Sequence, residues 1–115
     1  MKIKKINFEY GEFNCDDYIE FEDGSKITYY HEQDCCEVNY ADFRQLDDIA
    51  LSADFDMDKL AFEPLEHGFR FGNKPNKMFF VPCYSEQNGY YSDQVGIYFN
   101  GNKVIDILEC SEIDG

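Results

Sequence analysis

The sequence is poor in basic residues: it has 10 Lys and Arg against 24 Asp and Glu, which gives a formal net charge of −14 at pH 7. Binding to a nucleic-acid backbone or to anionic lipid depends on Lys and Arg, which displace the counterions. We therefore expect no direct binding to nucleic acid. The same charge steers a protein toward basic protein surfaces, although its plainest effect is solubility.

Long apolar stretches are missing as well. No segment approaches the roughly 20 apolar residues that a membrane-spanning helix requires, and residues 1–10 lack the apolar core of a signal peptide. The chain has five cysteines, and an odd number does not suit the disulfide framework of a secreted domain. These features predict a cytoplasmic protein with reduced thiols and no membrane partner.

Familiar catalytic and binding motifs are also missing. The sequence has no phosphate-cradling glycine loop, no nucleophile elbow, no zinc-protease helix and no Cys-x-x-Cys pair. Residues 54–65 begin like a calcium-binding loop, with Asp at alternate positions. Lys59 and Leu65 then stand where an EF-hand needs Gly and Glu, so we reject that assignment.

The apolar content is high for so charged a chain. Hydrophobic residues make up 43% and aromatic residues 17% of the sequence, which is more than a disordered acidic tail contains. A length of 115 residues suits one domain. We therefore expect a single folded domain over residues 1–115, with its charge on the outside.

Short β-rich runs separated by turn residues predict a fold of class α+β, with a mostly antiparallel sheet of six or seven strands. Asn-Gly at positions 100–101 favours a type I′ hairpin turn. We expect Ile97 to pair with Val104 across this turn. The next residue, Tyr98, should then pair with Lys103. The candidate strands for this sheet lie within residues 2–8, 18–21, 27–31, 35–40, 68–71, 77–82, 95–99 and 103–108.

One short helix is expected to pack on this sheet. Asp42 is a suitable N-cap, and apolar residues follow it at helical spacing. The pattern predicts a helix of about ten residues. Its apolar face would consist of Phe43, Leu46, Ile49 and Ala50.

The most unusual string runs from His31 to Glu37 and combines an imidazole, two thiols and three carboxylates. Thiolates together with an imidazole suit Zn²⁺ in a tetrahedral site. His31, Cys35 and Cys36 are therefore the candidate zinc ligands.

Further ligands for that site would have to come from other cysteines, namely Cys15, Cys83 or Cys110. Two alternatives stay open. The cysteines are often simply buried as small apolar residues. A histidine, His31 or His67, would otherwise lower the pKa of a thiol and activate it for catalysis.

Two stretches are candidates for contact with a partner. One is an acidic stretch that we expect to be exposed on the helix and on the loop after it. The other follows the turn at Asn88-Gly89, where tyrosines offer a large contact area at low entropic cost, or are buried at the start of a strand. The candidate partner-binding residues are Asp47, Asp48, Asp54, Asp56, Asp58, Tyr90 and Tyr91.

Three segments together resemble a small family of unknown function found in phage and bacterial genomes. They are His-Glu-Gln-Asp-Cys-Cys-Glu at 31–37, Leu-Asp-Asp-Ile at 46–49 and Asn-Gly-Tyr-Tyr-Ser at 88–92. The chain departs from the family at Arg44-Gln45, where the family tends to have Gly-Asp. The resemblance implies a phage or mobile-element setting, hence a bacterial cytoplasm, and supplies no reaction.

These observations lead to three functional expectations. The first is an acidic interaction protein that inhibits a host nucleic-acid-handling complex, such as a nuclease or a CRISPR effector, whose nucleic-acid channel is basic. The second is a small metal- or thiol-dependent enzyme centred on His31, Cys35 and Cys36. The third is a structural accessory domain with its cysteines in the core.

Overall fold

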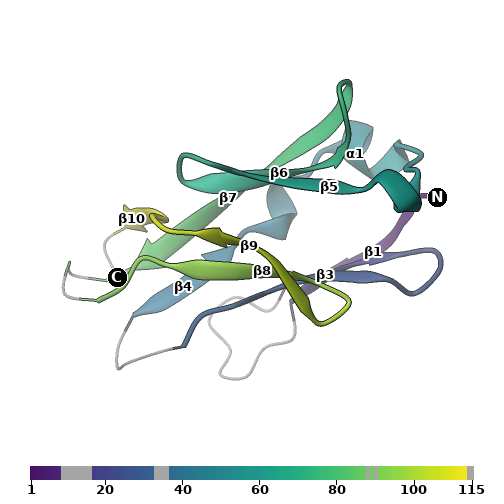
Figure 1. Cartoon of the computed structure of the whole chain (residues 1–115). Coiled ribbons are helices and arrows are strands. Elements are labelled where there is room, and N and C mark those ends of the chain that lie inside the picture. The colour runs from purple at the N-terminus through teal and green to yellow at the C-terminus, as the bar shows by residue number, and fades with distance from the viewer. Residues whose placement is uncertain (9–16, 33–36, 88, 90, 114–115) are drawn as a thin grey trace.

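A computed structural model of the chain describes residues 1–8, 17–32, 37–87, 89 and 91–113. These residues form ten strands in two sheets, with very little helix (Figure 1). The prediction of a mostly antiparallel sheet structure is confirmed. The prediction of one sheet with six or seven strands is wrong, because the strands divide between two layers that share one core.

The first sheet has the order β1-β2-β3-β8-β9, and all of its neighbouring strands are antiparallel. Asn100 and Gly101 have φ of 49° and 84°, as a type I′ turn between β8 and β9 requires. Tyr98 pairs with Lys103 as predicted, whereas Ile97 pairs with Ile105 because a bulge shifts the register. The strands are β1 (Ile3–Asn7), β2 (Tyr18–Phe21), β3 (Lys26–Tyr30), β8 (Val95–Phe99) and β9 (Asn102–Ile107).

The second sheet is built around β7, the longest strand. Its first half pairs with β6, and its second half lies between β4 and β10, of which β10 is parallel to it. The sequence predicted neither β5 nor β10. In β5 the reason is Pro64, a residue that argues against a strand but is tolerated at the edge of a sheet. The strands are β4 (Val38–Ala41), β5 (Ala61–Leu65), β6 (Gly68–Asn73), β7 (Lys77–Glu86) and β10 (Ser111–Ile113).

The predicted ten-residue helix is wrong. Asp42 caps a short 3-10 helix, η1 (Phe43–Gln45), and the chain becomes extended at Leu46. A separate α-helix, α1 (Asp48–Ser52), starts after its own cap and has only five residues. Ala50 is buried as expected, but Ile49 is 70% exposed because the two short helices do not share one face. A second 3-10 helix, η2 (Met57–Lys59), follows in the predicted loop.

The core lies between the two sheets. Phe55 occupies one part of this core. The centre of its ring lies 5.7 Å from that of Phe21, 5.8 Å from that of Phe71 and 5.7 Å from that of Phe79. The edge strands β5 and β9 also meet, and the ring of Phe62 on β5 packs against that of Phe99 at the end of β8. Fully buried residues elsewhere in the core are Ile19, Ile27, Phe43, Phe69, Val81 and Ile97.

In the described part of the chain, none of the helices has the length and apolar character needed to span a membrane.

Candidate functional site

Of the predicted zinc ligands, Cys35 and Cys36 lie outside the described residues. His31 directly follows β3, and its Nε2 atom lies 3.7 Å from Oε2 of Glu37, the residue before β4. Both side chains are withdrawn from solvent, with exposed fractions of 9% and 0%. Within the described ranges, no group of three His, Cys, Asp or Glu side chains is arranged to hold a metal ion. The zinc site therefore stays a prediction.

Two of the cysteines considered as further ligands are in the core. Cys83 and Cys110 are 0% and 2% exposed, and both are free thiols. A hydrogen bond between the two thiols, together with burial, raises the pKa of Cys83. Both cysteines thus behave as small buried residues, which is the alternative that the sequence left open for them.

A buried amide, Asn39 on β4, organises the polar groups around His31. Its Nδ2 atom donates to the carbonyl oxygens of Ser92 at 2.7 Å and Gln94 at 3.0 Å, and it lies 3.2 Å from His31 Nδ1. An amide nitrogen has two N–H groups, and the two carbonyl oxygens are its closer acceptors, with His31 Nδ1 beside them as a third polar neighbour. Nε2 of the same ring faces Glu37.

The same network extends across β7 to the surface. Ser85 Oγ donates to Asn39 Oδ1, and Gln87 Nε2 donates to Ser85 Oγ at 2.6 Å and to Asp93 Oδ1 at 2.7 Å. Gln87 is 7% exposed, and its Oε1 atom accepts from the backbone nitrogen of Tyr91 at 2.7 Å. The network therefore fixes the segment before β8 and holds the carboxylate of Asp93 in one position.

A second carboxyl group, that of Glu112 on β10, lies beside Asp93. A hydrogen bond with Asp93 and the repulsion between their two charges raise the pKa of Glu112. The backbone keeps the pair together, because Cys110 N donates to Asp93 O at 2.9 Å and Gln87 N donates to Ile113 O at 3.2 Å. The exposed Glu112 and the partly exposed Asp93 thus form a pair of neighbouring carboxyl groups.

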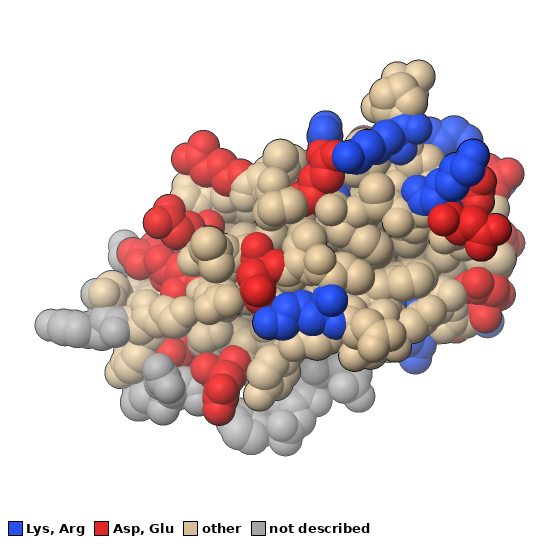
Figure 2. All heavy atoms as spheres, in the orientation of Figure 1, with Lys and Arg blue, Asp and Glu red and all other residues tan. Residues whose placement is uncertain are grey.

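The carboxyl pair belongs to a larger acidic surface. Residues 64–68, 84–94 and 105–113 contain no Lys or Arg, and the fold brings them together through the β7–β10 pairing and the contact of His67 Nδ1 with Glu109 O at 3.1 Å. Figure 2 shows the left-hand end of the molecule, where β10 lies, with acidic side chains and no basic ones. We call this surface the acidic end; it comprises Glu66, Glu86, Asp93, Glu109 and Glu112.

Sequence reasoning missed the acidic end and favoured the acidic stretch at residues 47–58, which we call the aspartate loop. Its aspartates are exposed, as predicted. Several of them have local structural roles: Asp47 caps α1 by accepting from Ala50 N at 3.0 Å, and Asp56 caps η2 by accepting from Asp58 N at 3.1 Å. The three segments of the acidic end lack Lys and Arg, but so do residues 47–58, and only the fold shows that the three segments meet.

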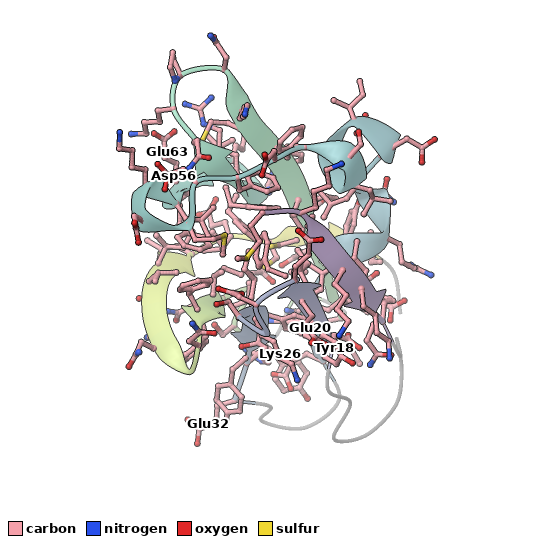
Figure 3. All side chains as sticks on the ribbon, turned by 90° about the vertical axis from the view of Figure 1, so that its right-hand side faces the viewer. Tyr18, Glu20, Lys26, Glu32, Asp56 and Glu63 are labelled. Atoms are coloured by element: carbon pink, nitrogen blue, oxygen red, sulfur yellow. The ribbon has the colours of Figure 1, made fainter. Side chains whose placement is uncertain are left out.

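Cations also surround the aspartate loop. Asp54 contacts the amino group of Met1, which lowers the pKa of its carboxyl group. The loop borders a groove of about 660 Å³ that is also lined by Lys59, Lys74 and Lys77. Figure 3 places Asp56 on the same side of the molecule as Glu63, whose pKa is lowered by hydrogen bonds from Lys74 and Arg70. Nearby cations therefore compensate part of the negative charge here, most directly at Asp54.

The two predicted tyrosines have different outcomes. Tyr91 is partly buried and is held by its backbone nitrogen, while Tyr90 lies outside the described residues.

Comparison of the chain with known protein families, characterised proteins and solved structures finds no match. The candidate site therefore rests on the geometry of the acidic end.

Proposed function

We propose that this protein is a binding protein that docks its acidic end on a basic surface of a partner that handles nucleic acid, such as a nuclease or a CRISPR effector. The observation that carries this proposal is the Asp93–Glu112 carboxyl pair. The fold holds two acidic groups together where no Lys or Arg of the same segments neutralises them.

A guanidinium or ammonium group from a partner would relieve the repulsion within this pair. Charge-assisted hydrogen bonds to two carboxylate groups are among the stronger polar contacts in protein interfaces. Gln87 already holds Asp93 in place, so little conformational freedom would be lost on binding. The acidic end is therefore suited to receive a basic side chain.

The nature of the partner follows from charge. Nucleases and CRISPR effectors hold nucleic acid in positively charged channels, and a protein with a net charge of −14 is attracted to such surfaces over long range. By occupying the channel, the acidic end would exclude the nucleic acid. The phage or mobile-element setting that the family resemblance implies agrees with an inhibitor of this kind.

A cleavage assay with purified nucleases and CRISPR effectors tests the proposal. We expect the protein to inhibit cleavage by at least one of them, less so as salt is raised. The double variant Asp93→Lys/Glu112→Lys should weaken inhibition about ten-fold or more. The matched variant Asp48→Lys/Asp58→Lys changes the charge equally in the aspartate loop and should inhibit nearly as well as the parent.

Either of two results would contradict this assignment. Inhibition that persists in the acidic-end variant but is lost in the aspartate-loop variant would move the docking surface to residues 47–58. Inhibition that does not respond to salt would exclude a contact based on charge.

We also propose a structural zinc ion held by His31, Cys35 and Cys36, as the sequence predicts. Elemental analysis of untagged protein should find about one zinc per chain, the complement of a single closed site. The variant Cys35→Ser/Cys36→Ser should lose it. A parent protein without stoichiometric zinc would return these thiols to a purely structural role.

A further inference from the structure

The outer face of the first sheet carries a hollow next to the acidic end. It has a volume of about 390 Å³ and is lined, among others, by Tyr30, Gly96, Tyr98 and Asp106. Tyr30 on β3, Gly96 on β8 and Asp106 on β9 lie in one row across the three strands. Because Tyr98 is two residues beyond Gly96, it projects from the same face. We call this site the tyrosine hollow.

Gly96 creates the space at the centre of this hollow. A Cβ atom at this position would lie 3.1 Å from Cε1 of Tyr98 and 3.7 Å from both Asp106 Oδ1 and Lys103 Cε. The ring of Tyr98 therefore leans over the glycine. Tyr30, which is 59% exposed, stands beside the glycine on the neighbouring strand. The hollow thus offers two aromatic side chains around a gap in the sheet surface.

Carboxylates complete the lining. Asp106 accepts from Gln94 Nε2 at 3.3 Å, and Glu32 borders the same hollow and projects away from the molecule in Figure 3. A cation is already present, because Lys103 Nζ lies 3.1 Å from Asp106 Oδ1. On the same sheet face, Lys26 Nζ lies 4.4 Å from the centre of a second tyrosine ring, that of Tyr18.

We propose that the tyrosine hollow binds an arginine side chain from a basic segment of a partner protein, with the guanidinium stacked on Tyr98 and paired with Asp106. This inference rests on the proposed function and specifies its chemistry. Arginine fits better than lysine because its planar group stacks on aromatic rings and presents several donors at once. A phosphate-bearing ligand would meet Glu32 and Asp106, both negative.

Titration of the ¹⁵N-labelled full chain with short peptides, followed by nuclear magnetic resonance, tests this inference. The probes are acetyl-Gly-Arg-Gly-amide and its lysine and citrulline counterparts, of which citrulline keeps the planar shape without the charge. We expect the arginine peptide to shift the signals of Gly96, Tyr98 and Asp106. It should bind about five-fold more tightly than the lysine peptide.

Two variants should change the affinity for the arginine peptide in opposite directions. A general loss of structure would only weaken binding. Gly96→Ala fills the hollow and should weaken binding of the arginine peptide about five-fold. Lys103→Met removes the resident cation from Asp106 and should tighten it. Asp58→Asn, a charge change in the aspartate loop, should leave binding unchanged, and the spectrum of each variant reports whether it is folded.

Different results of this titration would contradict the arginine inference and the proposed function. Shifts confined to Asp93 and Glu112 would exclude the hollow and leave docking by the acidic end in place. No shift anywhere with the arginine peptide would count against both. Equal binding of the citrulline peptide, or binding of the neutral sugar maltotriose in the hollow, would show that charge does not select the ligand and would overturn the assignment to arginine.

Discussion

Asp54 in the aspartate loop and Glu112 at the acidic end are both exposed carboxyl groups, yet their pKa values are displaced in opposite directions. Contact with the amino group of Met1 lowers the pKa of Asp54, whereas hydrogen bonding and repulsion with Asp93 raise the pKa of Glu112. The two regions look alike in sequence. What distinguishes these two acids is whether the fold places a cation or a second carboxylate beside them.

The two regions are also held in place by different forces. Phe55 anchors the aspartate loop by packing among three other phenylalanine rings. The acidic end is fixed by hydrogen bonds that lead from Asn39 through Ser85 and Gln87 to Asp93. The first anchor is apolar and the second is polar, so substitutions should separate them.

The largest effect is expected at the apolar anchor. Phe55 is 3% exposed, and Phe55→Ala should lower the free energy of unfolding by about 3–5 kcal/mol, because it leaves a cavity among the rings. Urea denaturation measures this loss. Phe80→Ala is the control, since Phe80 is 46% exposed and should cost less than about 1 kcal/mol. Similar losses for both would mean that Phe55 does not anchor the loop.

The second-largest loss of stability is expected at the polar anchor. Asn39→Ala leaves Ser85 and two backbone carbonyls without their amide partner, so we expect a loss of about 2–4 kcal/mol in unfolding free energy. Asn102→Ala, at an exposed position, should change it by less than about 0.5 kcal/mol. A near-neutral effect of Asn39→Ala would show that the network does not hold the acidic end together.

A smaller effect separates structural from free carboxylates within the aspartate loop. Asp47→Ala removes the N-cap of α1 and should cost about 1 kcal/mol. The neighbouring Asp48 lies in the first turn, where its charge interacts with the helix dipole, so Asp48→Ala should cost about 0.5 kcal/mol or less. Thermal unfolding of both variants measures the difference, and equal losses would argue against the cap.

The smallest change concerns pH. Because folding raises the pKa of Glu112, ionisation of this group opposes folding, and stability falls as the pH rises above about 4.3. Glu112→Gln should remove this fall, so that the variant is more stable than the parent at neutral pH and equal to it in acid. Urea midpoints across this range measure the effect. Glu109→Gln is the control and should keep the parent's pH dependence.

The sequence predicted those features that depend on neighbouring residues. The β8–β9 hairpin follows from the turn chemistry of Asn100 and Gly101, and β2 and β3 lie close to the strands predicted at residues 18–21 and 27–31. The helix from Asp42 was wrong because apolar spacing alone does not show that the chain extends at Leu46.

The candidate site was harder to predict because its parts are distant in the chain. Asp93 and Glu112 are brought together by the parallel pairing of β10 with β7, which no local pattern reveals. The aspartate loop attracted attention because its acids are adjacent in sequence, while the cations near it, such as Lys74 and Lys77, come from the β6–β7 turn. Charge density along the chain therefore did not show where acids from distant segments meet.

The position of β10 has a consequence for the order of folding. Hairpins such as β8–β9 close locally, whereas β3 must find β8, and β10 must find β7, across long stretches of chain. Sheets with such pairings fold on the order of milliseconds to seconds. The Asp93–Glu112 pair forms only when β10 has joined β7, so a nascent or partly folded chain would carry its full negative charge without yet presenting the surface that we propose for partner recognition.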